Sequence, residues 1–239
     1  MLTTLVFILC TSSTMAVPWQ MHLRERQWRQ IYYIRKKLPK VSASFTQSKQ
    51  WLQQRSVLEQ DLPRMPPMNH QNVTKIIRRF AATLPYAGYT QGNLYLVYAI
   101  GMVFKDELTV FWAFACTVQK VHRFGPTTPY GVHIVPDYVF SLAPGIERSL
   151  WDIMVRFRWL YIMFGQTFPR ADLILPVWDY ILISRRRMFN MCAALVHHGM
   201  RSIDFSECHT ELEKAQRIIG QVIDTPEEVA SLISHAQQL

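Results

Sequence analysis

The sequence predicts an all-α fold, and three observations support this prediction. Apolar residues recur at the three- and four-residue spacing of amphipathic helices along almost the whole chain. Glycine is scarce, with 9 residues in 239, where average usage would give roughly 17. Apolar residues form 49% of the chain, which is enough for a buried core and excludes a disordered protein. We therefore expect a single multi-helix domain rather than a glycine-rich nucleotide-binding fold.

Six segments carry signals of individual helices. The first five are residues 19–37, 73–84, 95–104, 107–122 and 150–164. The first of these is amphipathic, and the last three are expected to be buried because they are apolar on most faces. A sixth helix is predicted to begin at Pro226, because Thr225 can cap it and Glu228 can close a capping box.

Prolines and glycines separate these segments. They place breaks at residues 62–68, 124–131 and 142–145. Residues 132–140 alternate weakly, as a strand would, but Pro136 interrupts the alternation. We therefore expect no strand there.

The net charge of +9 is concentrated at one end of the chain. Before residue 81 there are 13 basic and 3 acidic residues, whereas the remainder has 13 basic and 14 acidic ones. Such a basic region is typical of contact with nucleic acid, an anionic membrane surface or an acidic partner, and also of a solvated face. The four cysteines lie far apart without a CxxC pair, which excludes a disulfide scaffold and a zinc ribbon.

Residues 1–16 form an apolar leader whose role the sequence leaves open. The small residues Thr14 and Ala16 resemble those before a signal-peptide cleavage point, but no lysine or arginine precedes Arg24. Three alternatives stay open: a signal peptide, a membrane-touching tail, or the first buried segment of the domain.

Four short motifs follow one another along the chain. They comprise the pair Arg24 and Trp28, the set Leu58, Asp61 and Arg64, the run from Tyr89 to Gly92, and finally Phe168 and Pro169 followed by Trp178 and Asp179. In this order they resemble the TBC domain, the helical domain of GTPase-activating proteins for Rab GTPases. Each motif alone is weak, but together on a helical, glycine-poor background they form a strong signal. The resemblance implies one TBC-like domain over residues 17–239.

The resemblance also implies a mechanism. Arg64 corresponds to the arginine finger that stabilises the transition state of GTP hydrolysis in the partner. Gln91 corresponds to the glutamine finger that orients the attacking water. Asp61 is expected to hold Arg64 in an extended pose, because residues three apart on a helical turn share a face. Tyr89 and Gly92 are expected to shape the setting of the glutamine.

The other motif residues are expected to be structural. Arg24 and Trp28 share a helical face and would lock two helices together. Trp178 and Asp179 would supply core packing and a buried hydrogen-bond acceptor, and Pro169 belongs to the same structural motif. A catalytic role for Asp179 is not expected, since no base or nucleophile lies near it in the sequence.

The implied partner is a Rab-family GTPase in its GTP form. GTP and Mg²⁺ would be bound by that partner, so we expect no cofactor or metal of the chain's own. The chain would act in vesicle trafficking, in the cytoplasm or peripherally on an anionic endomembrane, without binding nucleic acid.

Three departures from the family pattern keep alternatives open. Met65 stands where the family usually has threonine, Thr90 replaces a common cysteine, and Asn93 replaces a methionine. A catalytically inactive module that binds or sequesters a Rab GTPase is therefore one alternative. A basic membrane-associated adaptor is another.

Two further clusters have simple explanations. His197 and His198 diverge by about 100° on a helix, so they are not expected to share a metal ion. Residues 185–187, three arginines, are expected to complement the C-terminal end of a helix, with contact to anionic lipid or the GTPase as the alternative.

Overall fold

The structure is a computed structural model that describes residues 16–32, 34–65, 68–84, 88–90, 92–122, 137–142, 146–153, 159 and 162–239. Nearly all of the leader, the predicted break at 124–131 and the glutamine at position 91 lie outside these residues.

The described residues contain helices and no strand, which confirms the all-α prediction. The helices are α1 (Ala16–Ile31), α2 (Ala43–Thr46), α3 (Lys49–Asp61), α4 (His70–Thr83), α5 (Gly92–Val103), α6 (Glu107–His122), α7 (Asp137–Leu142), α8 (Arg148–Ile153), α9 (Ala171–Ile181), α10 (Arg185–Ser202), α11 (Glu211–Gly220) and α12 (Pro226–Gln238). A short 3-10 helix, η1 (Leu62–Arg64), follows α3 directly. Among the described helices, none combines the length and the apolar character needed to cross a membrane.

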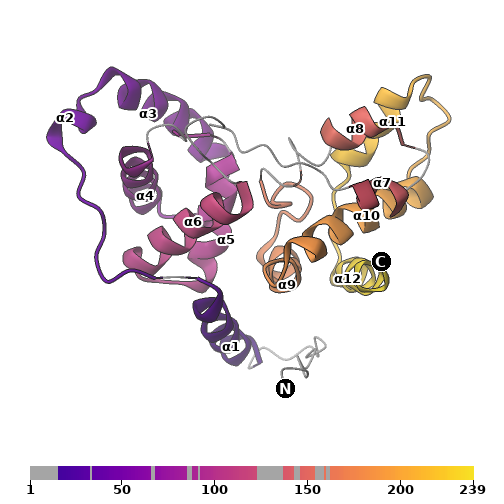
Figure 1. Cartoon of the computed structure of the whole chain (residues 1–239), viewed down its shortest axis with the longest axis horizontal. Helices are drawn as coiled ribbons and strands as arrows, with labels where there is room; N and C mark the ends of the chain where they lie inside the picture. The colour runs from indigo at the N-terminus through magenta and orange to yellow at the C-terminus, as the bar shows by residue number, and fades with distance from the viewer. Residues whose placement is uncertain are drawn as a thin grey trace.

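The helices form two groups that meet at α9 (Figure 1). Helices α2 to α6 lie on one side, and α7, α8 and α10 to α12 lie on the other. Helix α9 packs against α5 of the first group and against α10 and α12 of the second. One continuous apolar core runs through both groups, and it contains five almost fully buried tryptophans: Trp28, Trp51, Trp151, Trp159 and Trp178.

The best-predicted helices are those whose apolar residues face the core. Helix α6 has the predicted bounds, and α5 begins slightly earlier than residue 95. Helix α4 begins at His70 rather than at residue 73, because the side chain of Asn69 accepts a hydrogen bond from the backbone N–H of Asn72 (3.0 Å) and caps the helix there.

The first predicted helix is too long at its C-terminal end. Helix α1 ends at Ile31 instead of residue 37. Further on, the carbonyl oxygen of Lys37 accepts a hydrogen bond from Trp112 Nε1 (3.0 Å), and the guanidinium of Arg35 lies 4.7 Å from the centre of the Trp112 ring. These contacts with α6 hold the segment in a non-helical path that its periodicity does not reveal.

The predicted helix of residues 150–164 is also wrong at its end. Helix α8 is described to Ile153 and residues 154–158 lie outside the described residues, but Met163 and Phe164 are not helical, since they have left-handed φ angles of 48° and 64°. The carbonyl oxygen of Met163 accepts a buried hydrogen bond from Trp178 Nε1 (3.0 Å). Because a non-glycine residue in this conformation costs on the order of 1–3 kcal/mol, the surrounding packing must hold the turn in place.

Residues 185–187 follow the end of α9, and their complementing of that helix end stays a prediction, but they also form the first turn of the next helix. They begin α10, where the side chain of Ser184 caps the helix by accepting a hydrogen bond from Arg187 N (3.3 Å). The helix dipole therefore opposes these charges. The guanidinium of Arg187 instead lies 5.3 Å from the centre of the Tyr180 ring, a cation–π contact.

Helix α12 begins as predicted. The Thr225 side chain accepts a hydrogen bond from Glu228 N (3.3 Å), but the Glu228 carboxylate bonds the Thr225 hydroxyl (2.7 Å) instead of the backbone. The complete capping box is found at Thr210 and Glu213, at the start of α11.

Candidate functional site

The candidate site is built around the end of α3 and the 3-10 helix that follows it. Asp61 is the last residue of α3, and η1 carries Arg64 as its last residue. Pro63 occupies the first turn of η1, where its fixed φ angle suits the helix and its missing N–H costs nothing. After Arg64 the backbone becomes extended at Met65, so the arginine stands at a turn of the chain.

Asp61 and Arg64 differ sharply in exposure. The Asp61 side chain is 9% exposed, whereas that of Arg64 is 70% exposed. Their closest atoms, Asp61 Oδ1 and Arg64 Nη1, are 3.5 Å apart. The distance is at the limit of a hydrogen bond and the guanidinium is exposed, so the contact contributes little to stability and orients Arg64 without withdrawing it from solvent.

Tyr89 fixes the carboxylate that faces Arg64. Its hydroxyl donates a hydrogen bond to Asp61 Oδ2 (2.9 Å). The backbone N–H of Tyr89 in turn donates to Gln54 Oε1 (3.2 Å), which ties this segment to α3. Gly88, just before it, has a φ of 59° and a Cβ there would lie 2.8 Å from the Gln54 amide. The buried carboxylate is thus held firmly on one side and contacts Arg64 loosely on the other.

A cavity of about 300 Å³ lies beside Arg64. Its other lining residues come from the end of η1, from α5, from the segment before α9 and from α9 itself: Met65, Tyr95, Tyr98, Ala99, Gly165, Gln166, Phe168, Pro169 and Ile174. This cavity places Pro169 beside Arg64, although the two residues are far apart in the sequence. Burial raises the pKa of Tyr98, so its hydroxyl remains a donor at neutral pH.

The left-handed turn at residues 163 and 164 precedes Gly165 and Gln166, which line this cavity. The turn leads into Gly165, where a Cβ would lie 2.6 Å from the Tyr95 ring. Only glycine permits so close an approach of the backbone to α5. The neighbouring Gln166 donates a hydrogen bond from Nε2 to the Tyr95 hydroxyl (3.2 Å), which joins the two walls.

Gln91 lies outside the described residues, but its neighbours are placed. Gly92 is buried and begins α5. The Asn93 side chain accepts hydrogen bonds from Thr90 N (2.8 Å) and from the Thr90 hydroxyl (3.1 Å). Asn93 N also donates to the carbonyl oxygen of Thr90 (2.9 Å). Thr90 and Asn93, which both depart from the family pattern, are therefore hydrogen-bonded to each other on either side of position 91.

A second polar cluster joins α1 to α9. Arg24 Nε lies 2.8 Å from Asp179 Oδ2 and 3.0 Å from Oδ1, and Arg24 Nη2 lies 2.8 Å from Oδ2. Trp28 Nε1 donates to Asp179 Oδ1 (2.8 Å). The rings of Trp28 and Trp178 stack with centres 5.6 Å apart. The structure thus gathers these four residues, distant in the sequence, into one contact between helices.

His197 has hydrogen-bond partners at both ring nitrogens. Its Nε2 lies 2.6 Å from the Leu142 carbonyl, which can only accept, so Nδ1 accepts from His235 Nε2 (2.7 Å) when the ring is neutral. Burial, followed by the nearby His197 and Arg201, lowers the pKa of His235. In the part of the chain that the structure describes, no group of His, Cys, Asp or Glu could hold a metal ion.

Three cavity residues were not predicted from the sequence: Tyr95, Tyr98 and Gln166. The first two belong to a predicted buried helix, and their outward face cannot be recognised without knowing what packs beside it. Gln166 stands two residues beyond the segment 150–164 predicted to be helical. Its proximity to Arg64 depends on the left-handed turn, which leaves no periodic signal.

The fold and the order of its motifs define an all-α domain of one recognisable class. The sequence profile of the Rab-GTPase-TBC domain matches residues 15–203 of the 239-residue chain. The chain belongs to this family, which confirms the resemblance drawn from the motifs. Domains of the family generally interact with Rab GTPases. A comparison with curated proteins finds no match.

Proposed function

We propose that the chain accelerates GTP hydrolysis by a Rab-family GTPase in its GTP form, with Arg64 as the arginine finger. The observation that carries this proposal is the contrast between Asp61, buried and bonded to Tyr89, and Arg64, exposed beside it. A residue that acts in a partner's active site must be accessible, and it must be oriented before the partner arrives. Arg64 meets both requirements.

The chemistry of phosphoryl transfer explains why an arginine suits this position. Negative charge on the phosphoryl oxygens must be stabilised in the transition state, and an arginine supplied in trans increases the rate about 10³–10⁵-fold. A guanidinium is always charged and presents a planar fork of donors that matches phosphate oxygens. The loose contact of Arg64 with Asp61 leaves these donors available.

Gln91 is proposed as the residue that orients the attacking water, while the partner binds GTP and Mg²⁺. A neutral amide suits this role because it can donate and accept hydrogen bonds at once. The hydrogen bonds between Thr90 and Asn93 support the proposal, because they fix the backbone on both sides of position 91.

A binding module without catalysis is the second candidate function. The side chain of Met65, next to Arg64, is packed against the core, and Thr90 and Asn93 depart from the family pattern beside Gln91. A misplacement of about 1 Å can cost about 10²-fold in rate, so these substitutions favour this alternative.

Single-turnover GTP hydrolysis across a panel of purified Rab GTPases tests the proposal. We expect wild type to accelerate at least one Rab and Gln91→Ala to lose most of that acceleration. If a GTP-bound Rab binds the chain but no Rab is accelerated, the chain is a binding module and not a GTPase activator. If none binds, both functions are excluded.

Tyr89→Phe tests whether Asp61 positions Arg64. The variant removes the hydroxyl that donates to Asp61 Oδ2, so we expect a loss of about tenfold in the stimulated hydrolysis rate, because the finger is less well oriented. Affinity for the GTP-bound partner should change little. Tyr138→Phe, on α7, is the matched control and should hydrolyse like wild type. Equal rates for Tyr89→Phe and the control would contradict the positioning role.

A further inference from the structure

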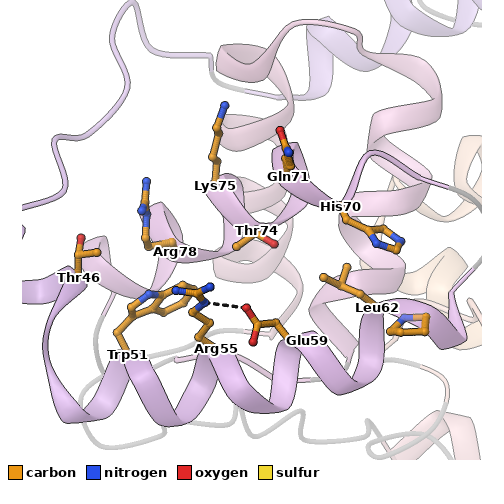
Figure 2. A pocket seen from close by; sticks show the side chains of 11 residues that line it. Thr46, Trp51, Arg55, Glu59, Leu62, His70, Gln71, Thr74, Lys75 and Arg78 are labelled. Carbon is orange, nitrogen blue, oxygen red and sulfur yellow. Dashed lines mark hydrogen bonds and ion pairs between the residues drawn. The ribbon is translucent and has the colours of Figure 1, made fainter.

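An open cleft of about 530 Å³ lies between α3 and α4, on the other side of η1 from the cavity beside Arg64. Leu62 and Pro63 line this cleft, whereas Arg64 and Met65 line the other cavity. Figure 2 shows side chains of α3 along one edge of the cleft and side chains of α4 along the other. The cleft is therefore distinct from the proposed finger site.

Positive charge dominates the cleft. Arg55, Lys75, Arg78 and His70 line it, and Glu59 is the one carboxylate in its described lining. The cleft belongs to the basic first third of the chain, so its excess charge is part of a larger positive region. Such a concave basic site attracts anions.

The α3 charges are paired with each other, but those of α4 are not. Arg55 Nε lies 2.7 Å from Glu59 Oε1. Within the described residues, Lys75 and Arg78 form no ion pair, and Figure 2 shows both extending in the same direction from α4. The Nε of Arg78 is buried and has no acceptor among the described residues. Because this Nε is buried, a ligand in the cleft would bond the terminal Nη atoms of Arg78 and the Nζ of Lys75 instead.

The neutral lining and the size of the cleft narrow the ligand further. Thr46, Gln71 and Thr74 offer hydroxyl and amide donors, and the buried ring of Trp51 forms part of the wall. A volume of about 530 Å³ lies in the range of sites for small organic molecules, roughly 300–1,000 Å³. It exceeds the needs of a single phosphate ion.

We propose that this cleft binds a small molecule with two or more phosphate groups on a polar ring. Arg78 and Lys75 would contact the phosphates, and Thr46, Gln71 and Thr74 would bond the remaining oxygens. Arginine forks match phosphate geometry, and lysine supplies a mobile point charge. The same chemistry is offered by a soluble phosphorylated polyol and by the head group of a phosphorylated lipid.

Isothermal titration of the whole chain with inositol 1,4,5-trisphosphate, in the absence of any GTPase, tests the proposal. We expect saturable binding with one site per chain. Lys75→Gln combined with Arg78→Gln should weaken it by at least about tenfold, since each loses a charge-assisted contact. The matched control combines Arg26→Gln with Lys36→Gln, which removes the same charge from exposed positions outside the cleft lining, and should bind within about twofold of wild type.

Two vesicle arms identify the source of the ligand. Vesicles that contain phosphatidylinositol 4,5-bisphosphate are compared with phosphatidylserine vesicles of equal surface charge. If the chain binds the phosphatidylinositol 4,5-bisphosphate vesicles more tightly, and the Lys75→Gln and Arg78→Gln double variant loses this preference, the ligand is a lipid head group. If the chain binds inositol 1,4,5-trisphosphate but prefers neither vesicle, the ligand is a soluble molecule. The proposal would be overturned if inositol 1,4,5-trisphosphate did not bind saturably, or if the two double variants lost the same affinity for it. It would also be overturned if an acidic peptide bound the cleft more tightly than inositol 1,4,5-trisphosphate.

Discussion

Arg64→Ala is expected to reduce the stimulated rate of GTP hydrolysis by about 10³–10⁵-fold, close to the intrinsic rate of the GTPase. The reason is that the substitution removes the charge that would neutralise the phosphoryl oxygens in the transition state. At about 1.36 kcal/mol per tenfold, this loss corresponds to roughly 4–7 kcal/mol of barrier. Single-turnover hydrolysis at saturating chain concentration measures it directly.

Folding should not contribute to this loss. The Arg64 side chain is 70% exposed and contacts Asp61 at 3.5 Å, so removing it changes the free energy of unfolding by about 1 kcal/mol at most. Arg64→Lys keeps a charge but loses the planar fork, and we expect it to recover only a small part of the rate. The matched control is Arg26→Ala, an exposed arginine on α1, which should keep the wild-type rate.

The affinity for the GTP-bound partner distinguishes an arginine finger at Arg64 from an arginine that only helps to bind the partner. Since the arginine would act mainly in the transition state, Arg64→Ala should bind the GTP-bound partner almost as tightly as wild type. A variant that keeps most of the stimulated rate would contradict the assignment of Arg64. A variant that loses affinity and rate together would instead make Arg64 part of the docking surface.

The sequence was sufficient for the parts of the fold that depend on local patterns. Helix α6 could be placed at both ends because its apolar residues face the core on most sides and Glu107 can begin it. Asp61 and Arg64 could be brought together because three residues of helical chain fix their spacing. Thr225 could be identified as a cap because Pro226 and Glu228 follow it at the positions that a helix start favours.

The remaining features depend on contacts between distant segments. Helix α1 ends early because Trp112, on α6, binds the chain beyond it. The turn at Met163 requires a hydrogen bond from Trp178. The cavity beside Arg64 requires that turn to bring Gln166 against Tyr95. None of these contacts is encoded by a local period, so a single sequence could not predict them.

Asp179→Ala is expected to lower the free energy of unfolding by about 2–4 kcal/mol. The substitution leaves the indole N–H of Trp28, a residue only 1% exposed, without its acceptor. It also leaves the largely buried guanidinium of Arg24 without its partner. The full cost of a broken buried pair is not expected, because the Asp179 side chain is 33% exposed and water can partly replace it.

Urea unfolding followed by circular dichroism measures this change as a shift in the midpoint at constant slope. Glu59→Ala is the control, because it removes the carboxylate of an exposed arginine pair and should cost less than about 1 kcal/mol. Asp179→Asn keeps an acceptor for Trp28, so its loss of unfolding free energy should lie between those of Asp179→Ala and Glu59→Ala. Similar midpoints for Asp179→Ala and Glu59→Ala would show that this cluster does not lock α1 to α9. Without urea, where Asp179→Ala is expected to remain folded, this variant should stimulate hydrolysis at nearly the wild-type rate. The reason is that, within the described residues, the contacts of Arg24, Trp28 and Asp179 do not include Asp61 or Arg64.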